Sequence, residues 1–147
     1  MSELASPPRA KRPEFRNINA LQDLPTYRLP PAGWVSILHR ISGAIMFSLM
    51  PFIIWMFDTS VSSEFSFARF TSAFGVGIGF VPGWFFKLLA LAILWAYLHH
   101  FIAGLRHLYM DINHAVSKEF GRSSAIVTLS LSIGLTVILG AKLFGLY

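Results

Sequence analysis

Histidines gather in the stretch from Tyr97 to Asp111, which begins in an apolar run and ends among charged residues. On an α-helix, His100, Gly104 and His107 share one face because they stand at i, i+4 and i+7. His99 is one step round, on a different face. An imidazole buried in hydrocarbon is costly, so ionisable residues inside a membrane segment indicate function. A histidine one turn before a glycine offers an axial nitrogen beside bare backbone, where a flat macrocycle could lie. The pattern favours a haem-binding face, with a purely structural role at the membrane boundary as the alternative.

A second group of polar side chains opens the first apolar segment. Ser36, His39 and Arg40 stand at i, i+3 and i+4 and project from one helical face. A quinone carbonyl needs hydrogen-bond donors, and a nearby positive charge would stabilise negative charge on a partly reduced quinone. Ser36 supplies a hydroxyl and Arg40 a fixed charge with several donors. The group indicates a quinone site. The alternatives are a helix-start hydroxyl for Ser36 and an arginine that reaches for lipid phosphates.

The remaining histidines of these two stretches have more than one possible role. His39 and His107 could bind haem propionates, or one of them could be a second axial ligand to the iron. Asp111 follows His107 by four residues and could orient its imidazole. A surface salt link from Asp111 to Arg106 or Lys118 is the alternative.

The composition places these groups in a membrane protein. The chain has 147 residues, of which 54% are hydrophobic and 13% charged, and its mean hydropathy is +0.59. Soluble domains carry about twice that share of charge. We expect an all-α membrane protein in which residues 34–147 form a transmembrane domain, after a polar, basic segment at residues 1–33. Three transmembrane helices are predicted at about residues 34–57, 84–108 and 124–144.

Local signals add detail to these spans. Pro51 predicts a kink near the middle of the first span, and small residues predict helix-packing surfaces on the third at Ser130, Gly134 and Thr136. Between the first two spans, phenylalanines at Phe65, Phe67, Phe70 and Phe74 indicate a short amphipathic helix on the bilayer surface. Regular structure should then break at Gly75, Gly77, Gly79 and Pro82.

Cysteine content and charge limit the possible functions. The chain contains no cysteine, which excludes disulfides and a thiolate-bound iron–sulfur cluster within it. A net charge of +5 could indicate nucleic-acid binding, but the distribution of the basic residues along the chain indicates membrane topology instead. Basic residues gather in the N-terminal segment (Arg9, Lys11, Arg12, Arg16 and Arg28) and between the second and third spans (Lys118 and Arg122), against Arg69, Lys87 and Lys142 on the opposite side. The positive-inside rule puts the N-terminus in the cytoplasm. The segment shows no clear transit peptide, which favours a bacterial inner membrane over the mitochondrial one.

Two motifs resemble those of a known family. Ser36-Ile37-Leu38-His39-Arg40-Ile41-Ser42-Gly43 resembles the signature that opens the first membrane helix of the cytochrome b556 subunits of succinate dehydrogenase. His100-Phe101-Ile102-Ala103-Gly104-Leu105-Arg106-His107, with Asp111 following, is similar to their second signature. The two motifs together are highly specific, and the resemblance extends over most of the chain.

The resemblance implies a three-helix subunit that pairs with a second small membrane-anchor subunit to hold haem b in one helical bundle. His100 matches the axial ligand of the haem iron, with the other ligand from the partner. Ser36 and Arg40 match ubiquinone-site residues, and His39 and His107 match positions near the haem propionates. Succinate would be oxidised at FAD in a flavoprotein subunit, and electrons would pass through the clusters of an iron–sulfur subunit. This chain would hold no succinate-oxidising site. A small non-redox transporter or channel component with proton-relay histidines is the alternative.

Overall fold

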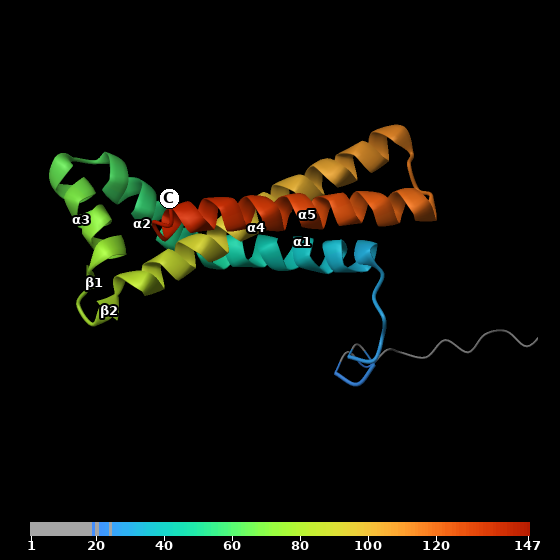
Figure 1. The fold of residues 1–147 in the computed structure, drawn as a ribbon, viewed down its shortest axis with the longest axis horizontal. Helices are drawn as coiled ribbons and strands as arrows, with labels where there is room; N and C mark the ends of the chain where they lie inside the picture. The colour runs from blue at the N-terminus through green and yellow to red at the C-terminus, as the bar shows by residue number, and fades with distance from the viewer. Residues whose placement is uncertain (1–18, 20, 24) are drawn as a thin grey trace, which may run out of the picture.

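The computed structural model describes residues 19, 21–23 and 25–147 of the chain. Three long helices form a bundle: α1 (Pro31–Ser48), α4 (Gly83–Asn113) and α5 (Lys118–Leu143). In Figure 1, α1 and α5 run alongside each other and α4 crosses them at an angle. Helix α1 packs against both α4 and α5, and α4 packs against α5. The shorter elements gather at one end: α2 (Met50–Val61), α3 (Glu64–Gly75) and a hairpin of β1 (Gly77–Ile78) with β2 (Val81–Pro82).

The long helices have membrane-spanning dimensions. By length and composition, α4 and α5 can each cross a membrane, and α1 with α2 makes a third span if the bent pair is counted as one. At 31 residues, α4 is about 46 Å long, whereas the hydrocarbon core is about 30 Å thick. The ends of α4 therefore reach beyond the hydrocarbon. The predicted all-α membrane fold is confirmed.

The predicted kink at Pro51 is confirmed as a break in the first span. Helix α1 ends at Ser48 and α2 begins at Met50, with a bend of 56° between their axes. Pro51 lies in the first turn of α2. It has no backbone N–H to donate to the carbonyl of Phe47 one turn earlier, and its ring crowds that carbonyl. The proline therefore accounts for the position of the bend.

The first helix begins earlier than its predicted span. Pro30 is the N-cap of α1 and Pro31 its first residue, a position that proline favours because its ring presets the helical φ angle. Before it, the backbone N–H groups of Gln22 and Asp23 donate to the carbonyl of Asn19 in a turn. The basic residues predicted at Arg9, Lys11, Arg12 and Arg16 lie outside the described residues.

Small side chains fill the centre of the three-helix bundle. Helix α5 buries Ala125, Thr128, Ser132 and Gly140, which recur every three to eight residues along one face, and a Cβ on Gly140 would lie 2.8 Å from Cδ1 of Leu91. Such residues let membrane helices approach closely. Large apolar side chains instead cover the outside of the bundle. Of the predicted packing residues, Ser130 is exposed and a Cβ on Gly134 would meet no atom within 4 Å, so these two positions do not pack against another helix of the described chain.

Aromatic side chains hold the short elements against α4. The predicted surface helix is α3, whose N-terminus is closed by a reciprocal hydrogen-bonded cap between Ser63 and Ser66. Phe86 of α4 lies at the centre of a ring cluster, with centroids 6.2 Å from Phe52, 6.0 Å from Trp55 and 6.3 Å from Phe74. The cluster joins α2, α3 and α4 away from the polar motifs of the sequence.

Candidate functional site

Three of the predicted site histidines meet between α1 and α4. The ring of His39 stacks on that of His100, with centroids 4.1 Å apart and planes inclined by 26°. The ring of His107 lies 5.3 Å from that of His39 and is tilted by 42°. We call these residues the histidine cluster. The two sequence motifs, far apart along the chain, therefore come together in one place.

Hydrogen bonding fixes which nitrogen of His100 carries the proton. Its Nδ1 lies 3.0 Å from the carbonyl oxygen of His39, and a carbonyl can only accept, so Nδ1–H is the donor. The Ser42 hydroxyl donates to the same carbonyl at 2.8 Å and lies 3.2 Å from Nδ1. In the neutral ring, Nε2 then keeps its lone pair. A backbone carbonyl on one ring nitrogen, with the other free to coordinate, is the usual arrangement for a metal-binding histidine.

Gly43 supports His100 from the opposite helix. A Cβ on Gly43 would lie 3.2 Å from Cε1 and 3.5 Å from Nδ1 of His100, so the imidazole rests almost directly on the α1 backbone. Residue types and spacing alone do not identify Ser42 or Gly43 as site residues. Their only sequence signal is their place at the end of the first motif.

Gly104 has a neighbour that its spacing from His100 did not indicate. A Cβ on Gly104 would lie 4.0 Å from Nε2 of His39, so in this structure the space beside the glycine receives His39 from α1. The same Nε2 is buried and makes no hydrogen bond in the described part of the chain. An unpaired buried nitrogen is costly. It gives the cluster a polar atom suited to a hydrogen-bonding group of a cofactor.

His99 lies on a different face of α4, as its spacing predicts. The residue is fully buried, and its Nδ1 lies 3.1 Å from the hydroxyl oxygen of Ser132 on α5. The ring also stacks on that of Trp95, with centroids 5.6 Å apart. These contacts make His99 a link between α4 and α5, outside the histidine cluster.

The predicted quinone-binding side chains lie on α1 on either side of His39 in the sequence. Ser36 is half-buried and Arg40 exposed, and neither side chain makes a hydrogen bond among the residues that the structure describes. Ser36 stands well inside α1, whose N-cap is Pro30, so the helix-start alternative for its hydroxyl is wrong. Both side chains keep their donors for an external group.

Asp111 and Arg106 have partners other than those predicted. The backbone carbonyl of Asp111 lies 2.8 Å from Nδ1 of His114, while its exposed carboxylate pairs with no histidine or cation within residues 25–147. Arg106 turns toward α5, where its Nε donates to the Ser124 hydroxyl at 2.9 Å and an Nη to the Gly121 carbonyl at 3.3 Å. The carboxylate therefore does not orient His107 in this structure.

The histidine cluster differs from a mononuclear metal centre. In the described ranges of the chain, no three His, Cys, Asp or Glu side chains are arranged to hold a metal ion. Nε2 of His100, whose Nδ1 already donates to a carbonyl, is a nitrogen that the described part of the chain can offer to iron. Iron that already has four ligands from a macrocycle needs only one such nitrogen from each side. The geometry fits a haem better than a bare cation.

Comparisons with known proteins identify the family of the chain. Residues 13–139 match the family described as succinate dehydrogenase/fumarate reductase transmembrane subunit. The chain is 34% identical to the succinate dehydrogenase cytochrome b556 subunit of Coxiella burnetii over 80% of this chain and 90% of that protein. It is 30% identical to the cytochrome b556 subunit of Paracoccus denitrificans, over 78% of this chain and 83% of that protein. It is 27% identical to the cytochrome b560 subunit of Reclinomonas americana, over 78% of each. With both motifs inside the matched region, the chain belongs to the family of transmembrane subunits of succinate dehydrogenase and fumarate reductase.

Proposed function

We propose that this chain is the haem b-binding membrane-anchor subunit of succinate dehydrogenase and helps to form the site at which ubiquinone is reduced. The family match and the names of the relatives support the complex and the haem. A second membrane-anchor subunit would complete the haem site. Flavoprotein and iron–sulfur subunits would carry the FAD and the clusters, which fits a chain that contains no cysteine.

The observation that carries the proposal is the hydrogen bond from Nδ1 of His100 to the carbonyl of His39. It leaves Nε2 as the coordinating atom, and Gly43 behind the ring keeps the imidazole in one orientation. A bound haem b accepts and returns one electron at a time. The unpaired Nε2 of His39 and the adjacent His107 are suited to hold the haem propionates.

Ser36 and Arg40 are proposed to bind the carbonyl oxygen of ubiquinone. The side chains are separated by one helical turn on α1, beside the histidine cluster, and both have unused donors. Arg40 would add a fixed positive charge where the quinone gains electron density. The iron–sulfur subunit and the second anchor would supply the rest of this site.

The proposed orientation puts the N-terminus and the turn between α4 and α5 on the cytoplasmic side of a bacterial inner membrane. The first turn of α1 and the turn between α4 and α5 lie at the same end of the bundle (Figure 1). Basic residues concentrate there. Quinone could then meet electrons from peripheral subunits without crossing the membrane.

Substitution of the two polar residues of α1 tests the quinone site. Losing a hydrogen bond from a neutral donor costs about 0.5–1.5 kcal/mol, and from a charged donor about 1.5–3 kcal/mol. We expect Arg40→Ala to impair succinate-dependent quinone reduction more than Ser36→Ala, while reduction of a water-soluble dye survives in both. The two activities are measured on the same purified complexes, with Arg122→Ala on exposed α5 surface as the matched control.

Two results would contradict the quinone assignment. One is a parallel loss of quinone and dye reduction in assembled Arg40→Ala complex, which would indicate damage upstream of the quinone. The other is quinone reduction as fast as in the Arg122→Ala control. Haem content of each preparation shows separately whether the histidine cluster has survived.

A further inference from the structure

A groove between α4 and α5 lies outside the histidine cluster and has no role in the proposed function. It has a volume of about 490 Å³ and is lined mainly by apolar side chains, with Arg106 in its wall. Arg106 and His107 are neighbours in the sequence but diverge in space. His107 faces α1 and the cluster, whereas Arg106 faces α5.

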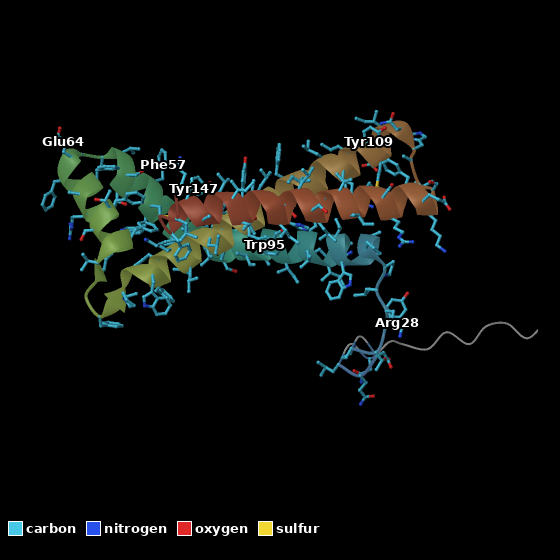
Figure 2. The ribbon with its side chains drawn as sticks, viewed as in Figure 1. Arg28, Phe57, Glu64, Trp95, Tyr109 and Tyr147 are labelled. Atoms are coloured by element: carbon cyan, nitrogen blue, oxygen red, sulfur yellow. The ribbon has the colours of Figure 1, made fainter. Side chains whose placement is uncertain are left out.

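The groove changes in chemistry along its length. Ile102 and Val127 line it toward the middle of the bundle, and Arg106 and Ser124 follow. Tyr109 and Phe120, whose ring centroids are 5.6 Å apart, lie nearest the turn between the helices. Figure 2 shows Tyr109 near that end of α4. An apolar stretch that ends in a cation and a tyrosine ring is typical of a helix surface that reaches the membrane interface.

Two hydrogen bonds hold the guanidinium of Arg106 in place and leave its other N–H donors unused. Its Nε–H and one Nη–H donate to the Ser124 hydroxyl and the Gly121 carbonyl. No carboxylate pairs with it among the described residues. A guanidinium has five N–H donors, so three remain, arranged in a planar fork that suits a phosphate.

The groove is also open toward the surroundings of the bundle. Leu105 and Val127, one on each wall, are 50% and 55% exposed. In a membrane-spanning chain this side faces lipid or another membrane protein. A fixed cation at the polar end of an apolar slot complements an acyl chain that ends in a phosphate, and basic pockets between membrane helices bind anionic lipid headgroups.

We propose that this groove binds one anionic phospholipid, with an acyl chain between α4 and α5 and the phosphate on Arg106. The bound lipid would join the two helices at the end where the histidine cluster lies. This inference does not depend on the haem or quinone assignments, because none of the cluster residues lines the groove.

Native mass spectrometry of the delipidated complex that contains this chain tests the proposal. The probe is phosphatidylglycerol, with zwitterionic phosphatidylcholine of the same chains as the comparison. We expect one high-affinity phosphatidylglycerol site that weakens about tenfold in Arg106→Gln, because a charged donor is lost. Arg122→Gln, which removes an exposed cation of α5 outside the groove, should leave this site unchanged.

A second variant separates the slot from the charge. Val127→Trp should fill the apolar wall and weaken phosphatidylglycerol binding while Arg106 stays in place. Equal binding of phosphatidylglycerol by the wild-type, Arg106→Gln and Val127→Trp complexes would overturn the proposal. So would cross-linking of a cysteine placed at Val127 to a helix of a partner subunit, because a protein segment would then fill the groove. Inorganic phosphate should not compete with the lipid.

Discussion

The carbonyl oxygen of His39 connects the two halves of the site at the level of single atoms. It accepts hydrogen bonds from Nδ1 of His100 and from the hydroxyl of Ser42, while the His39 ring stacks on His100. The backbone of α1 thus determines the tautomer of a side chain on α4. A mutation of α1 near this carbonyl should therefore affect the haem even though it removes no ligand.

Two glycines beside the cluster allow a matched comparison. A Cβ at position 43 would approach Cε1 of His100 to 3.2 Å, whereas a Cβ at position 104 would lie at an ordinary 4.0 Å from Nε2 of His39. We expect Gly43→Ala to shift the haem absorption bands or lower haem content, and Gly104→Ala to leave both near wild type. Gly104→Leu, which must displace His39, should lower haem content.

Haem content per assembled complex and the reduced absorption spectrum are the measurements for these variants. Gly104→Ala is the matched control for Gly43→Ala, because both variants add one methyl group beside the histidine cluster. A Gly43→Ala complex with unchanged haem and a Gly104→Ala complex without haem would reverse the expected order. His100 would then not rest on α1 as the structure has it.

The histidines of the site can be predicted from the sequence, whereas the backbone groups that contact them cannot. Spacing places His100 and His107 on one helical face and His99 on another, and the structure agrees. Gly43 and the carbonyl of His39 could not be found in this way. Their roles depend on which faces of α1 and α4 meet, and a periodic pattern in one helix does not contain that information. For the same reason the sequence did not indicate that His39 lies beside Gly104; a macrocycle beside Gly104 stays a prediction.

At the scale of the elements, the spans predicted from hydropathy and the helices of the structure begin and end at different residues. The second span was predicted to end near residue 108, but α4 continues to Asn113. Helix α5 begins at Lys118, where the Ser117 hydroxyl accepts the N–H of Phe120, before the third predicted span. Hydropathy marks where the chain leaves hydrocarbon, whereas caps and hydrogen bonds decide where the helix ends.

The ring cluster around Phe86 should stabilise the end of the molecule away from the histidines. Phe86 is half-buried, so we expect Phe86→Ala to cost about 1–3 kcal/mol, below the value of about 3–5 for a fully buried phenylalanine. Phe80→Ala is the matched control because Phe80 is 98% exposed.

Thermal unfolding and the haem spectrum of the two phenylalanine variants are compared in the purified complex. Phe86→Ala should unfold at a lower temperature with an unchanged haem spectrum, and Phe80→Ala should match the wild type in both. If the two variants unfold alike, the aromatic cluster contributes little to stability. A haem loss confined to Phe86→Ala would instead couple the two ends of the bundle.

At the scale of the whole molecule, α1 with α2 followed by α4 and α5 makes up to three membrane crossings. The chain has no cysteine, so single cysteines report its orientation cleanly. In inverted vesicles, Ser117→Cys in the α4–α5 turn should react with an impermeant maleimide on this subunit, and Ser62→Cys between α2 and α3 should not. Intact spheroplasts should give the opposite result. Labelling of both sites from the same side would exclude the three-crossing topology.

Ligation of iron by His100 is the central claim, and the absorption spectrum of its leucine variant tests it most directly. Wild-type complex should show a Soret band that sharpens on reduction. His100→Leu should remove or grossly shift this spectrum, since Nε2 is lost. His99→Leu is the same substitution at the neighbouring position. It should leave the haem absorbance per assembled complex unchanged, because the His99 ring contacts Ser132 on α5. An unchanged haem spectrum in His100→Leu would contradict the account.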